Sequence, residues 1–157
     1  MAEESQNEPD EGELAADYLE ALLDIVDLDG DIEIEAANGR TYLRLASEDT
    51  EDLVKLSKPD VVQALQELTR LAVQQKTGEF SRLILDVEGS RDKRAEELGH
   101  LVDAAIAKID EGASSAALPA MSSYERKLVH DIVSERGYTS ESHGEGPDRH
   151  TVITATD

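Results

Sequence analysis

Apolar side chains recur every three or four residues in four segments of the chain, and this spacing predicts amphipathic helices. Three of them are expected over residues 12–28, 60–77 and 91–111. The fourth follows Ser122, which precedes Glu125 by the three residues typical of a capping box, and it ends near residue 136.

Alternating apolar and polar positions predict β-strands between these helices. Residues 31–46 alternate on both sides of Asn38-Gly39, a dipeptide typical of a two-residue hairpin turn. We expect this hairpin and a strand within residues 81–88 to share one sheet, with helices packed on a single face. Residues 139–148 indicate a polar strand end and loop, and residues 150–155 a final strand.

The order of these elements predicts an α+β fold of two small α/β units. The first domain is expected over residues 12–112, with the long helix at its carboxyl end. Residues 113–118 are interpreted as a linker, and residues 119–157 as the second domain. Residues 1–11 are almost free of apolar side chains, so we expect a disordered acidic tail.

The charge of the chain is strongly negative but unevenly distributed. The 157 residues carry a formal charge of −21, and the first 35 contain fourteen acidic side chains and no Lys or Arg. The remainder is only mildly acidic and can still present a local basic face. The chain has no Cys, which excludes disulfides and thiolate zinc sites. No apolar run reaches the ~18 residues of a membrane helix, so we expect a cytoplasmic protein without membrane insertion.

The main candidate for binding chemistry is a pair of side chains on the fourth helix. Arg126 and His130 are four residues apart and therefore lie on one helix face, where they can bind a phosphate together. Lys127 is a neighbouring cation, and we expect Arg149 and His150 to approach the same face from the last strand. The alternative is a surface pair with local salt bridges.

Patterns typical of catalysis or cofactor binding are missing from the sequence. Ser142 and His143 adjoin in a predicted loop without the strand-to-helix turn of a catalytic serine. The four His residues have no metal-ligand spacing, and there is no Walker loop. We therefore expect neither an enzyme nor a bound cofactor or metal.

The residues around Arg126 and His130 belong to a longer pattern. Residues 121–130 read Met-Ser-Ser-Tyr-Glu-Arg-Lys-Leu-Val-His, and Ser140-Glu141-Ser142 and Gly144-Glu145-Gly146-Pro147-Asp148-Arg149 follow. This closely resembles the R-three-H (Arg-x-x-x-His) domain at the end of the Jag, or SpoIIIJ-associated, proteins. The predicted helix–strand–strand–helix–strand order of the first half is similar to the type II KH domain that precedes it in that family.

The resemblance implies a function in RNA metabolism. It implies a non-catalytic protein that binds single-stranded RNA, with single-stranded DNA as the alternative ligand. It also implies post-transcriptional control linked to cell elongation and division. A small KH-domain protein or a second copy of the chain is the implied protein partner.

The first half departs from the KH pattern at the loop that binds nucleic acid. KH domains hold the backbone with a Gly-x-x-Gly loop, where this chain has Leu56, Ser57, Lys58 and Pro59. Leu56 adds bulk and Pro59 removes an amide donor, so we expect phosphate binding at this loop to be impaired or lost. The alternative function is a protein-interaction adaptor, whose first domain mediates dimerisation or docking and whose RNA contact is vestigial.

Overall fold

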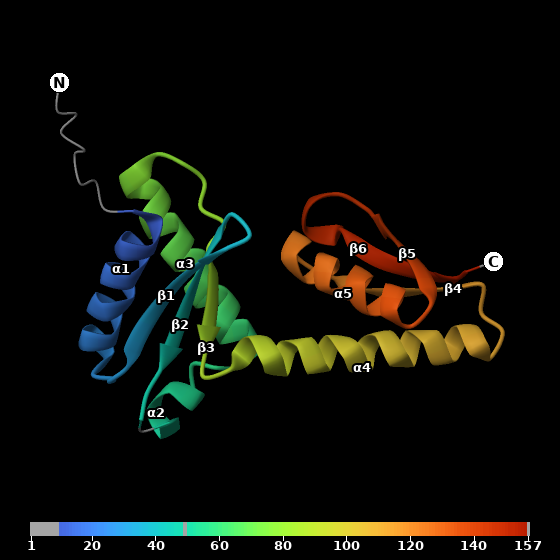
Figure 1. The fold of residues 1–157 in the computed structure, drawn as a ribbon, viewed down its shortest axis with the longest axis horizontal. Helices are drawn as coiled ribbons and strands as arrows, with labels where there is room; N and C mark the ends of the chain where they lie inside the picture. Colours follow the sequence, from blue (N-terminus) through green and yellow to red (C-terminus); the bar gives the residue numbers. More distant parts are fainter. Residues whose placement is uncertain (1–9, 49, 157) are drawn as a thin grey trace. The chain divides into compact units, whose positions relative to one another are not determined.

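The chain folds into two compact units that divide after Arg91 (Figure 1). The computed structural model describes residues 10–48 and 50–156. Each unit contains one three-stranded sheet together with helices, which confirms the predicted α+β fold of two small α/β units. Most of the predicted acidic tail, residues 1–9, lies outside the described residues.

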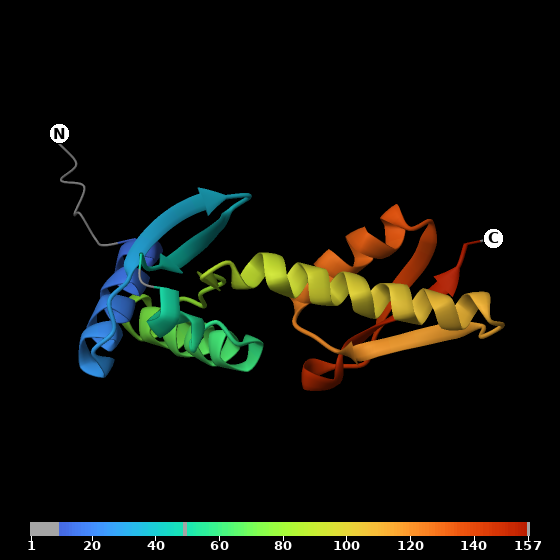
Figure 2. The same ribbon diagram turned by 90° about the horizontal axis from the view of Figure 1, so that it is seen from below.

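The described residues of the first unit form three helices and three strands. In chain order these are α1 (Glu11–Val26), β1 (Asp31–Ala37), β2 (Arg40–Ala46), α2 (Thr50–Val54), α3 (Pro59–Thr77) and β3 (Ile84–Val87). Helices α1 and α3 lie on the same side of the sheet (Figure 2). Strand β2 is central, antiparallel to β1 and parallel to β3, so the predicted hairpin and third strand share one sheet.

Two features of the first unit show how local sequence determines its structure. Asn38 and Gly39 both adopt positive φ, 53° and 72°, as the hairpin turn requires. Helix α2 was not predicted, because its five residues are too few to show helical periodicity. Its Leu53 is fully buried in the same core as Leu43 and Leu85.

In the second unit, the residues described up to Thr156 form two helices packed on an antiparallel sheet. Its elements are α4 (Ser90–Asp110), β4 (Ser115–Ala120), α5 (Ser123–Glu135), β5 (Tyr138–His143), a short 3₁₀ turn (Gly146–Asp148) and β6 (His150–Ala155). Strand β6 is central, between β4 and β5. The core combines side chains from both helices with side chains of β4 and β6.

The predicted domain boundary was wrong, because α4 belongs to the second unit. Leu98 and Val102 of this helix are fully buried in the same core as Ile153 of β6. The predicted linker at residues 113–118 is also wrong, since β4 begins at Ser115 and pairs with β6. This strand consists mainly of small residues and a proline, a composition that is typical of a linker.

Charged side chains connect α4 to the beginning and the end of α5. Arg94 donates to both carboxylate oxygens of Glu125, with Nε–Oε1 and Nη2–Oε2 distances of 3.1 Å. The hydrogen bond to Glu125 is the main cause that raises the pKa of Arg94. At the other end of α5, Arg136 Nε lies 3.0 Å from Asp103 Oδ1.

Across the described ranges, none of the helices is long and apolar enough to cross a membrane.

Candidate nucleic-acid interface

Helix α5 positions both residues of the predicted phosphate-binding pair. Ser122 is the N-cap, and its hydroxyl accepts the Glu125 amide at 3.3 Å, as the capping-box spacing predicts. Val129 is fully buried in the core and fixes the rotation of the helix. Arg126 and His130 then lie one turn apart, half-buried beside β5.

A serine of β5 holds the two side chains together. Ser142 Oγ lies 3.0 Å from Arg126 Nη1 and 3.0 Å from His130 Nε2. Arg126 Nε also donates to the Met121 carbonyl at 3.2 Å, and His130 Nδ1 contacts Ser140 Oγ. We call Arg126, His130, Ser140 and Ser142 the Arg126 cluster.

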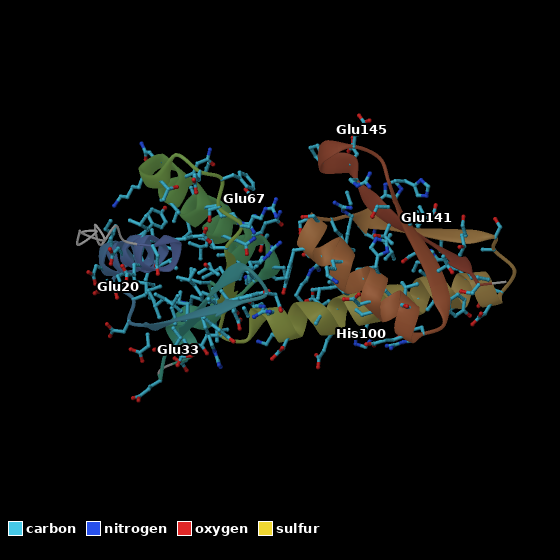
Figure 3. All side chains as sticks on the ribbon, turned by 45° about the horizontal axis from the view of Figure 1, so that its top comes forward. Glu20, Glu33, Glu67, His100, Glu141 and Glu145 are labelled. Carbon is cyan, nitrogen blue, oxygen red and sulfur yellow. The ribbon has the colours of Figure 1, made fainter. Side chains whose placement is uncertain are left out.

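The two serines were missed as site residues, although they belong to the segment that carries the family resemblance. They are two residues apart on β5, separated by Glu141 (Figure 3), so they project from the same face of the strand. Ser140 pairs with the fully buried Ile153, which identifies this face as the one covered by α5. Alternation of Ser140 and Ser142 was the available signal, but their contact with α5 depends on tertiary packing.

The electrostatics of the cluster depend mainly on Arg126. The pKa of His130 is lowered from its ordinary 6.5, first by burial and then by the nearby Arg126 charge, while Asp131 opposes the shift. His130 is therefore predominantly neutral at pH 7 and makes neutral hydrogen bonds to the serines. The guanidinium supplies the positive charge.

Lys127 lies outside the cluster. Its Nζ is 3.5 Å from Asp131 Oδ2, and both side chains are well exposed, at 79% and 62%. Lys127 thus forms a local salt bridge. The salt-bridge alternative was stated for Arg126 and His130, but the described contacts of Arg126 are with a carbonyl and a hydroxyl.

The structure does not bring His150 to the Arg126 cluster. In β6, His150 precedes Thr151, which is fully buried on the α5 side, so His150 projects from the opposite face of the sheet. There it pairs with His143 of β5, with ring centroids 6.4 Å apart. Arg149 Nη1 donates to the Gly144 carbonyl at 2.8 Å, within the β5–β6 connection. The expected convergence of His150 with Arg126 and His130 was wrong.

The segment that the KH resemblance aligns with the Gly-x-x-Gly loop, Leu56 to Pro59, follows α2 and runs into the first residue of α3. Leu56 is partly buried against the first core. The amides of Leu56 and Ser57 donate to the carbonyls of Leu53 and Val54, and the Ser57 hydroxyl also donates to Val54. Pro59 begins α3 and has no amide hydrogen. Two amides of the loop are thus hydrogen-bonded within the chain, whereas a phosphate-binding loop would present its amides to the ligand.

Comparison with known proteins supports the assignment of the second unit. Residues 96–155 match the R-three-H domain family. This range contains the whole Arg126 cluster and begins within α4, in agreement with the observed unit boundary. The second unit is therefore similar to R-three-H domains over almost its whole length. The resemblance of these residues to the R-three-H pattern is therefore confirmed, while the KH resemblance of the first unit stays a prediction.

The chain is also similar to three bacterial proteins, each named RNA-binding protein KhpB. The one from Clostridium symbiosum is 28% identical over 143 residues, 89% of this chain and 64% of the relative. The one from Bacillus subtilis is 28% identical over 142 residues, 87% of this chain and 67% of the relative. The one from Lactiplantibacillus plantarum is 26% identical over 139 residues, 87% of this chain and 42% of the relative. The chain thus spans two thirds or less of their length, and the similarity extends into its first unit.

Proposed function

We propose that this chain is a non-catalytic protein that binds single-stranded RNA through the Arg126 cluster of its R-three-H domain. The observation that carries the proposal is the shared contact of Arg126 and His130 with Ser142 inside the matched range. The names of the three similar KhpB proteins support RNA as the ligand. The resemblance to the Jag proteins extends the proposal to a cytoplasmic regulator linked to cell elongation and division.

The free donors of Arg126 suit a backbone phosphate. Two of its guanidinium N–H groups contact Met121 and Ser142, and the described part of the chain supplies no partner for the others. Because the guanidinium is held on one side in the free chain, its remaining donors are preoriented for the first contact with an oxygen ligand. With His130 neutral, the single positive charge matches the single negative charge of a phosphodiester. Such a contact positions RNA without reading its sequence.

The acidic composition of the chain restricts the proposed RNA contact to a small part of the surface. Residues 1–91 carry 23 acidic and 8 basic side chains, a net charge of −15, and residues 92–157 carry 13 and 7, a net charge of −6. Exposed acidic residues of the first unit include Glu20, Glu33 and Glu67 (Figure 3). We infer that the first unit repels the RNA backbone and that binding depends on the few cations of the second unit.

A titration of the full chain with single-stranded RNA at several salt concentrations tests the proposal. Arg126→Ala should weaken binding similarly for unrelated RNA sequences and lower the salt slope by about 0.7, the value for one phosphate contact on a single strand. The matched control is Lys108→Ala, which removes one exposed cation of α4 outside the cluster. Wild-type binding by Arg126→Ala, with an unchanged salt slope, would exclude the Arg126 cluster as the RNA site. Single-stranded DNA and duplex RNA in parallel titrations distinguish the class of ligand.

One observation favours the adaptor function as a second candidate. Leu68 and Leu71 of α3 are 50% and 61% exposed, which is unusual for adjacent turns of one helix. The proposed partner for this face is a small KH-domain protein or a second copy of the chain. Sedimentation of the wild type and of Leu71→Glu separates these cases, because a self-associating chain should become monomeric in the variant. A chain that is monomeric as the wild type excludes self-association through this face.

A further inference from the structure

A buried hydroxyl next to the Arg126 cluster has no hydrogen-bond partner. Thr151 of β6 is fully buried, and among the described residues its Oγ1 is the buried side-chain oxygen or nitrogen without a partner. The other buried hydroxyls are paired: Thr69 Oγ1, for example, donates to the Leu65 carbonyl at 2.7 Å. Leaving a buried hydroxyl unpaired destabilises a protein, so the position of Thr151 calls for a physical reason.

The position of Thr151 connects it to the serine that holds Arg126 and His130. Thr151 is the direct cross-strand partner of Ser142 in the antiparallel pairing of β5 and β6. Directly opposed residues project from the same face, with Cβ atoms typically about 5 Å apart. Both side chains therefore lie beneath α5, and rotation of one serine side chain can bring the two hydroxyls together.

In the free chain the Ser142 hydroxyl is used by other partners. Arginine can only donate hydrogen bonds, so Ser142 Oγ accepts from Arg126 Nη1, and it also contacts His130 Nε2. A phosphate bound to Arg126 offers stronger acceptor oxygens than a serine hydroxyl. Competition by the phosphate for Nη1 can therefore release Ser142 from Arg126. The hydroxyl then keeps His130 Nε2 as a neighbour and is free to take Thr151 as its other partner.

We propose that Thr151 is a positioning residue for RNA binding: Ser142 turns from Arg126 to Thr151 when a phosphate binds to the guanidinium. Thr151 is then unpaired in the free chain and paired in the complex. This inference rests on the proposed function, because it requires a phosphate at Arg126. It predicts that the Thr151 hydroxyl lowers the stability of the free chain and raises its affinity for RNA.

Two substitutions separate the hydroxyl from the volume of the side chain. Thr151→Val keeps the shape and removes the hydroxyl, so the melting temperature of the second unit should rise by about 2–5 °C, while RNA affinity should fall by about threefold to tenfold. Thr151→Ser keeps the hydroxyl and removes a buried methyl group. Its melting temperature should fall, whereas its affinity should stay within about twofold of the wild type. RNA affinity should therefore depend on the presence of the hydroxyl and not on the stability of the variant.

A double-mutant cycle with Ser142→Ala completes the test. In that background Thr151→Val should leave affinity unchanged, because the partner of the hydroxyl is already gone. Wild-type affinity of Thr151→Val, or a parallel loss of stability and affinity, would overturn the inference. A large affinity loss in Thr151→Ser would overturn it as well. Arg126→Ala, measured alongside, distinguishes this failure from failure of the proposed function: wild-type binding by that variant contradicts the RNA site itself.

Discussion

The contacts of Arg126 predict that its loss destabilises the second unit. If Arg126 projected freely from an exposed helix face, its removal would cost the fold a few tenths of a kcal/mol at most. In the structure the guanidinium donates to Met121 O at 3.2 Å and to Ser142 Oγ at 3.0 Å. Arg126→Ala removes both hydrogen bonds and leaves Ser142 with one partner fewer.

The magnitude follows from these two contacts. Each hydrogen bond contributes on the order of 0.5–1.5 kcal/mol, so Arg126→Ala should cost about 1–3 kcal/mol. For a unit of this size that corresponds to a fall in melting temperature of roughly 5–15 °C. Lys127→Ala is the matched control: its exposed ion pair with Asp131 should contribute about 0–0.5 kcal/mol.

Amide hydrogen exchange reports this effect in the full chain without isolating the unit. The amide of the fully buried Ile153 in β6 should exchange faster in Arg126→Ala and at the wild-type rate in Lys127→Ala. Equal protection of Ile153 in Arg126→Ala and the wild type would refute the reasoning from the hydrogen bonds. The measurement also defines the conditions in which RNA binding by the variant reflects a folded unit.

Three further predictions follow from other contacts. Glu125→Gln weakens the two-point contact with Arg94 and should lower the unfolding free energy by about 1 kcal/mol in a denaturant titration; no change would mean that the pair contributes nothing net. The folded pKa of His130 lies below 6.5, so the unfolded chain binds more protons in that window, and stability should decline as pH falls from 6.5 through the folded pKa. His130→Gln should flatten this dependence of the melting temperature on pH. An unaltered profile would mean that another titrating group causes the dependence. Lys58→Ala should leave RNA affinity within about twofold, since its loop is not built as a phosphate cradle; a large loss would identify this loop as a main RNA site.

The sequence predicts those elements whose signals are local. Asn38-Gly39 specifies a turn through its own backbone preferences, and the hairpin forms as expected. Strand β4 was missed because Ala116, Ala117 and Pro119 lack the β-branched and aromatic side chains typical of strands. The long helix α4 was predicted as an element and assigned to the wrong unit. Its apolar side chains fit either core, and only tertiary packing decides between them.

The candidate site shows the same limit. The spacing of Arg126 and His130 predicts that they share one helix face, and the structure confirms it. That this face meets β5 and not solvent depends on packing. The side of the sheet taken by His150 was ambiguous, because Val152 and Ile153 are both apolar and either alternation is consistent with a strand.

The most direct test of the central claim is a nuclear magnetic resonance titration of the ¹⁵N-labelled full chain with single-stranded RNA. It reports which amides change environment, independently of any substitution. We predict that the largest shift changes occur at the Arg126 cluster, in residues 121–130 and 138–143, and that residues 55–60 change little. Dominant changes at residues 55–60, with the Arg126 cluster unaffected, would contradict the account and place RNA binding in the first unit.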